Sequence, residues 1–258
     1  MNESVRKALK ILNCLAESPT PMGVTQLASQ LQYPKSSVFD ILESLRAEEY
    51  IERVSESAPT YRIGVQSFRV GCAYGAHTDL CRFARPILWN LSEQTGASAY
   101  LAKEQDGVLL YLEKAEGKAS VRSACTIGST NELYRTGLGK ALLAAYAPAR
   151  VRATAGSLTR RTPRTITTMD ALEAELVQIR RRGYAIDDGE DNELLYCVAA
   201  PVFDYRNEPI GAISVSMVRG TVDASEQAEA GRKIQRAALE LSGKMGYARP
   251  FLLEENRL

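Results

Sequence analysis

The chain has 258 residues, of which 45% are hydrophobic and 24% charged, and its formal net charge at pH 7 is +1. These values are ordinary for a soluble globular protein and exclude a strongly basic or strongly acidic one. No uninterrupted apolar stretch approaches membrane-spanning length, and the N-terminus lacks the apolar run of a signal peptide. We therefore expect a cytoplasmic protein with no membrane partner.

Cysteine and histidine usage argues against metal, disulfide and catalytic roles. The five cysteines are widely spaced and form no Cys-x-x-Cys pair; they are Cys14, Cys72, Cys81, Cys125 and Cys197. This spacing indicates neither a disulfide framework nor a structural zinc site. His77 is the only histidine, which argues against a Ser-His-Asp or Cys-His catalytic site. We expect no metal, no cofactor and no enzymatic activity.

The first 50 residues predict three helices. Ser4 is a suitable N-cap for the first helix, and a second helix begins near Thr25. The tripeptide Gln-Tyr-Pro at 32–34 predicts a tight turn, with proline where a third helix begins. The residues that this third helix turns inward are Val38, Ile41, Leu42 and Leu45. Two short helices joined by such a turn are typical of a helix-turn-helix.

The outer face of the third helix carries polar residues suited to DNA, because the start of this helix touches base edges and phosphates in a helix-turn-helix. The candidates for these contacts are Lys35, Ser36, Ser37 and Asp40. Residues 50–54 and 60–63 predict a two-strand wing, whose Arg53 and Arg62 are available to the DNA backbone. The expected partner is a double-stranded DNA operator.

Charge balance leaves an alternative open for this segment. Residues 1–80 contain eight Lys and Arg against nine Asp and Glu, whereas phosphate neutralisation usually dominates DNA affinity. A helical mini-domain with a hairpin, used for protein contacts, is the alternative interpretation. Charge can nevertheless be segregated by face while its sum stays near zero.

The rest of the chain predicts a linker helix and one α+β domain. Residues 65–81 read as an apolar connecting helix, for which a second copy of the chain is the economical partner. Neighbouring strands joined by short turns indicate an antiparallel sheet flanked by helices. The predicted strands are 98–103, 107–115, 120–124, 195–203 and 209–218. The predicted helices are one closed by Gly96, then 139–146, 169–183 and one from about 222. We expect domains at 1–64 and 82–258, joined by 65–81.

The segment Gly137-Leu138-Gly139-Lys140 has two interpretations. Backbone amides at a helix start can hold an anion, or the glycines can simply ease the start of the helix. A Walker-type phosphate loop would need glycine where Tyr134 stands and Ser or Thr where Ala141 stands, so ATP binding is rejected.

Two further features remain open on spacing alone. Cys197 is either a nucleophile or, more commonly for cysteine, a buried structural residue. The acidic loop after the helix that Gly183 closes is either a metal-binding loop or a solvated turn, and its spacing does not match a calcium loop. On spacing the solvated turn is favoured. The acids concerned are Asp187, Asp188, Glu190, Asp191 and Glu193.

Taken together, these residues resemble the IclR family of bacterial transcriptional regulators over nearly the whole chain. The family pattern in the second domain is met by Gly183, Asp187, Glu190, Cys197, Val202, Phe203 and Asp204. Residues 136–143 resemble the family's helix-opening loop, and residues 34–38 resemble the start of its recognition helix.

The resemblance implies an N-terminal winged helix-turn-helix, a linker helix and a GAF-like effector domain, assembled as a dimer or a dimer of dimers on DNA. It also implies that a small organic acid or carbonyl compound binds between the sheet and the helix-opening loop. By position, Gly137 and Leu138 would offer backbone amides to a carboxylate or carbonyl. The polar side of the site would be formed by Asp187, Cys197, Ser214 and Ser216, with Leu195 on its apolar side.

The sequence departs from the family pattern at three positions. Asp40 replaces a basic residue on the recognition helix, where an acid repels phosphate and accepts from cytosine N4 instead. Glu49 replaces a common glycine before the wing. Arg135 replaces a small residue beside the ligand loop, and we expect it to supply a charge-assisted bond to an anionic ligand.

The sequence as a whole predicts a ligand-responsive DNA-binding regulator, a repressor or an activator, of a catabolic operon. One alternative is a regulator that acts constitutively, without ligand control. The other is a small-molecule hydrolase or reductase that uses Cys197 and Asp187.

Overall fold

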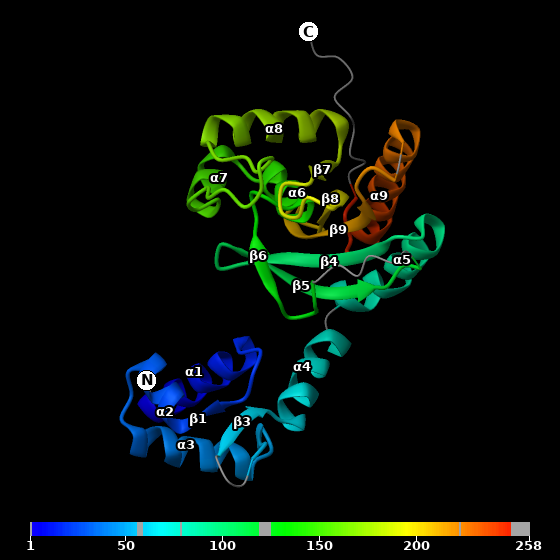
Figure 1. Cartoon of the computed structure of the whole chain (residues 1–258). Coiled ribbons are helices and arrows are strands. Elements are labelled where there is room, and N and C mark those ends of the chain that lie inside the picture. Colours follow the sequence, from blue (N-terminus) through cyan, green and yellow to red (C-terminus); the bar gives the residue numbers. More distant parts are fainter. Residues whose placement is uncertain (1, 56–58, 78, 119–124, 222, 249–258) are drawn as a thin grey trace. The chain divides into compact units, whose positions relative to one another are not determined.

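The computed structural model describes residues 2–55, 59–77, 79–118, 125–221 and 223–248. The chain divides into two compact units, residues 1–77 and 78–258, and each is described by itself (Figure 1). Among the described residues, no helix has the length and apolar character needed to cross a membrane.

The first unit is a winged helix-turn-helix. Its elements are α1 (Glu3–Glu17), β1 (Met22–Gly23), α2 (Val24–Leu31), α3 (Lys35–Ala47), β2 (Ile51–Arg53), β3 (Thr60–Ile63) and α4 (Val65–His77). The strands form an antiparallel sheet in the order β1-β3-β2. Residues from α1, α2, α3 and the strands share one core, whose fully buried members include Ile11, Leu27, Val38 and Leu42. The predicted helices and wing are confirmed.

The sequence missed three local details of this unit. Asn2, not Ser4, caps α1, because the Asn2 side chain accepts from the N–H groups of Ser4 at 3.1 Å and Val5 at 3.3 Å. The two-residue strand β1 is too short to show an alternating pattern, and only its pairing with β3 defines it. Glu49, in place of the family's glycine, adopts a left-handed φ of 59° just before the wing, a conformation that favours glycine.

The second unit is a six-stranded antiparallel sheet with helices on both faces. Its elements are α5 (Asp79–Thr95), β4 (Ser98–Gln105), β5 (Val108–Ala115), β6 (Thr130–Glu132), α6 (Gly137–Ala145), α7 (Pro148–Thr154), α8 (Met169–Arg182), β7 (Ala185–Asp188), β8 (Leu195–Phe203), β9 (Pro209–Val218) and α9 (Ala224–Lys244). The strand order is β6-β5-β4-β9-β8-β7. The predicted α+β class is confirmed.

Several predicted boundaries differ from those of the structure. The linker helix expected at 65–81 ends at His77 as α4, and residues 79–81 belong to α5. The acidic loop expected after Gly183 contains strand β7, which pairs with β8 and forms an edge of the sheet. The helix expected from residue 139 starts two residues earlier, at Gly137. Strand β6 and helix α7 were not predicted, since both are short. The strand expected at 120–124 lies outside the described residues.

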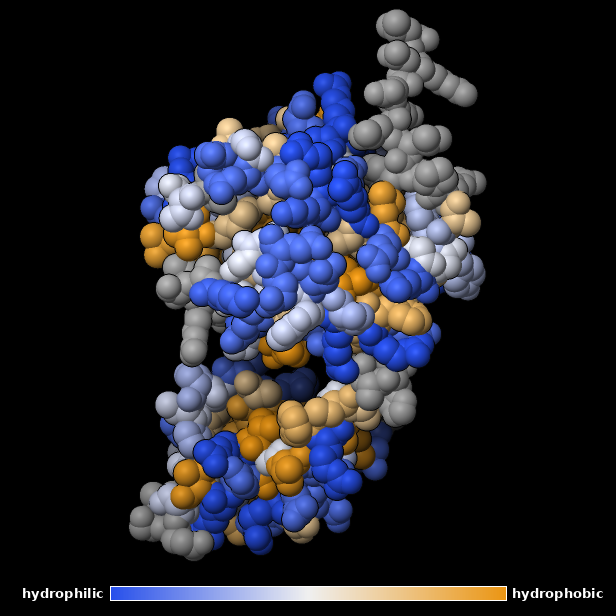
Figure 2. Space-filling view, turned by 90° about the vertical axis from the view of Figure 1, so that its right-hand side faces the viewer, coloured by the Kyte–Doolittle hydropathy of each residue, from blue (hydrophilic) through white to orange (hydrophobic). Residues whose placement is uncertain are grey.

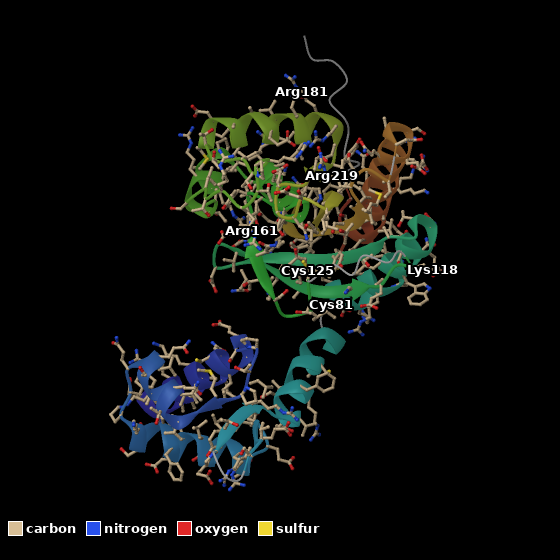
Figure 3. All side chains as sticks on the ribbon, in the orientation of Figure 1. Cys81, Lys118, Cys125, Arg161, Arg181 and Arg219 are labelled. Atoms are coloured by element: carbon tan, nitrogen blue, oxygen red, sulfur yellow. The ribbon has the colours of Figure 1, made fainter. Side chains whose placement is uncertain are left out.

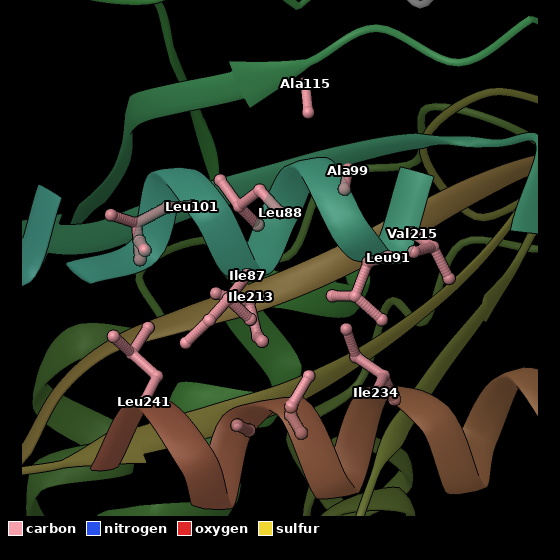
Figure 4. Close-up of a cluster of buried hydrophobic side chains, with 14 of the residues drawn as sticks. Ile87, Leu88, Leu91, Ala99, Leu101, Ala115, Ile213, Val215, Ile234 and Leu241 are labelled. Carbon is pink, nitrogen blue, oxygen red and sulfur yellow. The ribbon is translucent and has the colours of Figure 1, made fainter. Parts of the chain in front are cut away.

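Two apolar layers hold the second unit together. On one face α5 and α9 pack against the sheet, and Figure 4 shows Leu88, Ile213 and Leu241 among the side chains that meet there. On the other face α6 and α8 cover the sheet through a second cluster that includes Leu142 and Leu176 (Figure 1). Helix α6 crosses this second face with its first turn over β7 and β8, and this crossing positions the site described next.

Candidate functional site

A pocket opens between the first turn of α6 and the face of the sheet. It encloses about 410 Å³, including its open mouth. Its lining residues are Tyr100, Tyr111, Cys125, Thr136, Gly137, Leu138, Asp187, Asp191, Asn192, Leu195, Cys197, Ser214 and Ser216. Cys125, labelled beside the strands in Figure 3, comes from the segment that precedes β6.

Strand register brings the polar side chains of the sheet together. Asp187, Cys197 and Ser216 lie directly opposite one another on β7, β8 and β9. Ser214 lies opposite Tyr100 on the neighbouring strand β4, in the adjacent row. Directly opposed residues of an antiparallel pair point to the same face, so these side chains form one polar surface beneath α6.

The start of α6 supplies backbone donors to the same pocket. Thr136 caps the helix, and its Oγ1 accepts from the N–H of Gly139 at 3.1 Å. The N–H groups of Gly137 and Leu138 belong to the first turn, where helix geometry provides no intrahelical acceptor and the helix dipole favours negative charge. This arrangement favours the anion-binding interpretation of the glycine segment.

The two glycines of this turn differ in what a side chain would meet. A Cβ on Gly139 would lie 2.2 Å from the carbonyl oxygen of Leu133, a distance that the backbone cannot accept. A Cβ on Gly137 would lie 3.5 Å from the Cβ of Ala199 and 3.7 Å from those of Asp187 and Cys197. Gly139 therefore allows the turn to form, whereas Gly137 keeps space in the pocket.

The pocket lining includes seven of the eight residues that the sequence nominated as ligand contacts. The exception is Arg135, which the lining does not include. Its guanidinium pairs with the Asp191 carboxylate, with Nε 2.9 Å from Oδ1, and it also donates to the side-chain oxygen of Asn131. Asn131 in turn donates to Asp191 at 2.9 Å. Arg135 therefore compensates the negative charge of Asp191, an acid that lines the pocket.

Burial controls the protonation of Asp187. The side chain is 4% exposed, and this removal from water raises the pKa of its carboxyl to about 7. The backbone N–H of Glu190 donates to its Oδ1 at 2.7 Å, which opposes that rise. The pocket consequently changes charge near neutral pH, and a neutral Asp187 can donate a hydrogen bond as well as accept one.

Cys197 is a thiol rather than a thiolate. Its Sγ donates to the Ser216 hydroxyl at 3.3 Å. Removal from water and then the neighbouring Asp187 carboxyl raise the pKa of the thiol well above its ordinary value. A protonated thiol is a poor nucleophile, so the geometry favours a contact role over a catalytic one.

The acidic loop is not the solvated turn that its spacing favoured. Asp187 and Glu190 are buried, and Glu190 forms an ion pair with Lys140, whose side chain is 0% exposed. The hydroxyls of Thr162 and Thr165 donate to the carbonyl oxygen of Glu190 at 3.2 and 2.8 Å. Within the described ranges, no group of three or more His, Cys, Asp or Glu side chains is arranged to hold a metal ion.

Sequence reasoning missed several residues of this site. Thr136 carried a signal, because a threonine directly before a glycine-rich helix start is a preferred N-cap. No signal in the sequence indicated that Lys140 is buried. Lysine is almost never fully buried without a partner, and only the fold brings that partner near. Tyr100 and Tyr111 lie on β4 and β5, and only the assembled sheet decides which side of these strands faces the pocket.

The first unit presents the nominated DNA contacts at its surface. Of the residues on α3, Lys35, Ser36 and Asp40 are exposed and Ser37 is half-buried. On the wing, the exposed Arg53 donates to the carbonyl oxygen of Ser55 at 3.1 Å. The wing's Arg62 pairs with Glu52 across the hairpin, and both side chains are about half exposed, at 62% and 49%.

A winged helix-turn-helix followed by an α+β domain with a pocket lined by polar side chains defines a class of protein: a DNA-binding module joined to a small-molecule sensor. Comparison with known proteins gives the family. The model of the IclR helix-turn-helix domain matches residues 4–55, and that of the bacterial transcriptional regulator IclR C-terminal domain matches residues 72–243. The chain belongs to the IclR family of transcriptional regulators.

Curated relatives support this assignment. The transcriptional regulator XynR of Escherichia coli is 31% identical over 247 residues, which is 95% of this chain and 98% of that protein. The transcriptional repressor IclR of the same organism is 29% identical over 93% of this chain and 89% of its own. These relatives are transcriptional regulators, and the chain is accordingly a regulator rather than an enzyme that uses Cys197.

Solved structures show the same fold. An IclR-type regulator from Silicibacter superposes with a TM-score of 0.81 at 27% identity, covering 96% of this chain and 98% of that one. An IclR homologue from Microbacterium hydrocarbonoxydans, solved in complex with 4-hydroxybenzoate, has a TM-score of 0.81 at 18% identity and covers 94% of this chain and 99% of that one.

Proposed function

We propose that this regulator binds an operator through α3 and its wing and responds to a small organic acid or carbonyl compound held in the pocket. The observation that carries the proposal is that two unlike sets of polar groups meet in the pocket. The first turn of α6 offers backbone N–H groups, and the sheet beneath it offers Asp187, Cys197 and two serines.

Chemistry narrows the ligand to a compound with a carboxylate or carbonyl at one end. That group accepts from the N–H groups of Gly137 and Leu138, where the dipole of α6 favours negative charge. A hydroxyl or second carbonyl on the ligand meets Ser214, Ser216 and Asp187. Leu195 supplies an apolar wall, as in small-molecule sites where apolar side chains surround a few convergent polar groups.

The Microbacterium homologue that holds 4-hydroxybenzoate is a protein of this fold that binds a ligand of this class. At 18% identity the likeness is one of fold, so the pocket residues of this chain carry the argument about ligand class.

DNA recognition is assigned to the outer face of α3. We place Lys35, Ser36, Ser37 and Asp40 against bases and phosphates, and Arg53 and Arg62 against the backbone on the wing. A dimer, or a dimer of dimers, then sets two such helices into successive major grooves. In this arrangement residues 1–64 form the DNA-binding domain, 65–81 the linker, which contains α4 and the first residues of α5, and 82–258 the effector domain. The protein acts in the cytoplasm on an operon for catabolism of its ligand.

The ligand controls DNA binding by binding one state of the protein more tightly than another. A ligand shifts such an equilibrium only by its differential affinity for the two states. The first turn of α6 and the loop at Glu190 both line or adjoin the pocket, and Lys140 joins them by a buried ion pair. A shift of either element on ligand binding is therefore transmitted to the other through this ion pair.

The test combines a footprint with a ligand screen. The purified protein is footprinted on the DNA flanking its own gene at two salt concentrations, and protection that weakens at high salt supports operator binding. A library of small carboxylates and carbonyls is then screened by thermal shift, because a ligand at 100 times its Kd adds about 2.7 kcal/mol. Absence of protection at low salt overturns operator binding. Protection without any stabilising ligand indicates a constitutive regulator.

A further inference from the structure

One aromatic side chain stands exposed on the face of α3 that is assigned to DNA. Phe39 is 50% exposed, whereas its neighbours Val38 and Leu42 are fully buried in the core of the first unit. Other apolar side chains also reach the surface of this unit, seen as orange areas in the lower part of Figure 2. A single exposed apolar residue is ordinary, so the argument for a function of Phe39 rests on its position.

Helical spacing places Phe39 within a defined strip. Ser36, Phe39, Asp40 and Glu43 follow the i, i+3, i+4, i+7 pattern, so they are neighbours on one side of α3. Val38 and Leu42 pack on the other side. The strip starts in the first turn of α3, the part of a recognition helix that reaches base edges in a helix-turn-helix.

The two acids of this strip differ in their partners. The Glu43 carboxylate pairs with Arg46 at 2.8 Å and accepts from the Tyr61 hydroxyl at 3.4 Å. Asp40 forms no ion pair with any residue that the structure describes, and it is exposed beside Phe39. An uncompensated carboxylate repels phosphate, and in the major groove it accepts from the N4 amino group of cytosine.

We propose that Phe39 packs against the C5-methyl group of a thymine in the major groove, beside a cytosine whose N4 amino group donates to Asp40. The inference rests on the proposed DNA-binding role of α3 and adds which bases it reads. Thymine is the base that carries a methyl group on its major-groove edge, and apolar side chains recognise it there. The operator half-site therefore contains a thymine and a cytosine at neighbouring positions.

The experiment removes the methyl group alone. A duplex is enriched from a random library by the full-length protein, and each thymine is then replaced singly by uracil, which differs only in lacking the C5-methyl group. We expect one position in each half-site at which uracil weakens binding about fourfold, the value of one buried methyl group. The affinities are measured by fluorescence anisotropy.

Variants assign the effect to Phe39. The Phe39→Ala variant binds the unmodified duplex roughly tenfold more weakly, and uracil at the sensitive position does not lower its affinity any further. Leu9→Ala is the matched control, since Leu9 is exposed in the same unit but lies on α1, and it keeps the full uracil penalty. Circular dichroism and thermal unfolding establish that both variants fold.

Asp40 is tested by base exchange. Replacing the adjacent C·G pair by T·A weakens the wild-type protein about tenfold or more and leaves Asp40→Ala almost unaffected. Asp40→Ala also binds mismatched duplexes more tightly, because it removes a repulsive charge.

The failures are distinguishable. A wild-type protein that binds the enriched duplex but tolerates uracil everywhere overturns the inference and leaves DNA binding intact, as does a Phe39→Ala variant that keeps the penalty. Enrichment of no duplex overturns the proposed DNA binding and the inference with it.

Discussion

The Lys140 ammonium and the Glu190 carboxylate form an ion pair inside the second unit, with Lys140 fully buried at the start of α6 and Glu190 in the loop between β7 and β8. Glu175 of α8 lies 4.0 Å from the same ammonium, and Arg182 pairs with Glu175 at 2.6 Å. Ion pairs thus connect α8 with two elements that border the pocket, the start of α6 and the loop between β7 and β8. Desolvation makes this pair costly to break.

Removing the lysine alone is expected to destabilise the protein strongly. Lys140→Met leaves Glu190 buried without its cation, which costs about 3–5 kcal/mol of the free energy of unfolding. The double variant Lys140→Met/Glu190→Leu recovers most of this loss. Urea unfolding followed by the fluorescence of Trp89, the only tryptophan, reports on the second unit. Lys118→Met is the control, because its pair with Glu93 is exposed and contributes little. A double variant as unstable as the single one contradicts the argument.

Asp187 should make stability depend on pH. Its folded pKa of about 7 lies above the ordinary value of 3.8, so the folded state binds more protons between these values. The free energy of unfolding therefore falls as pH rises from about 4 to about 7, by up to about 4 kcal/mol, and levels off above that. Asp187→Asn keeps an acceptor for the Glu190 N–H and removes this fall. The difference between the two proteins is measured by urea unfolding across this range; parallel profiles would show that Asp187 titrates normally.

The same titration should control anion binding. Above pH 7 the Asp187 carboxylate adds negative charge to the pocket, so the affinity for a carboxylate found in the thermal-shift screen falls as pH rises from 6 to 8. Asp187→Asn makes this affinity independent of pH over that range. Calorimetry at several pH values checks the prediction, and an equal slope in the variant would assign the dependence to another group.

The two glycines of α6 should respond differently to alanine. Gly139→Ala places a methyl group against the Leu133 carbonyl and should destabilise the protein by several kcal/mol or prevent folding. Gly137→Ala meets only ordinary contacts, so its stability stays within about 1 kcal/mol while the methyl group lowers ligand affinity roughly tenfold. Thermal unfolding and ligand titration separate the two effects. Full ligand affinity in Gly137→Ala would place the ligand elsewhere.

Arg135 should affect ligand binding through Asp191. Arg135→Ala frees the carboxylate of a lining acid, and an anionic ligand then binds roughly tenfold more weakly. Adding Asp191→Asn restores most of that affinity, because the freed charge is gone. Isothermal titration of both variants provides the measurement. A loss that Asp191→Asn does not repair would instead support direct contact between Arg135 and the ligand.

Lys35 should strengthen binding to every DNA sequence by a similar factor. Lys35→Ala removes one phosphate contact for each bound recognition helix, so binding weakens for every duplex and the slope of log affinity against log salt falls by about one per helix. Anisotropy titrations over a salt series with specific and random duplexes test this. A loss confined to one sequence would assign Lys35 to a base edge.

The sequence by itself determined the helix-turn-helix, the α+β class and most of the residues nominated for the pocket that the structure does place in its lining. The spacing of Val38 and Leu42 fixed the inward face of α3 because helical period is a local property. Strands β8 and β9 were predicted with their observed bounds, since their apolar runs end at turn residues. Gly183 was predicted to close α8, and it does so with a φ of 81°.

Tertiary structure alone decided how these parts act together. Asp187, Cys197 and Ser216 belong to three strands, and only the register of those strands makes them one row. Lys140 and Glu190 are 50 residues apart, so no local pattern announces their pairing or the burial that makes it costly. Arg135 was expected to face the ligand, yet it pairs with Asp191, because the β7–β8 loop brings a carboxylate to it. Charge, burial and protonation depend on neighbours that are distant in the chain, and folding is what supplies them.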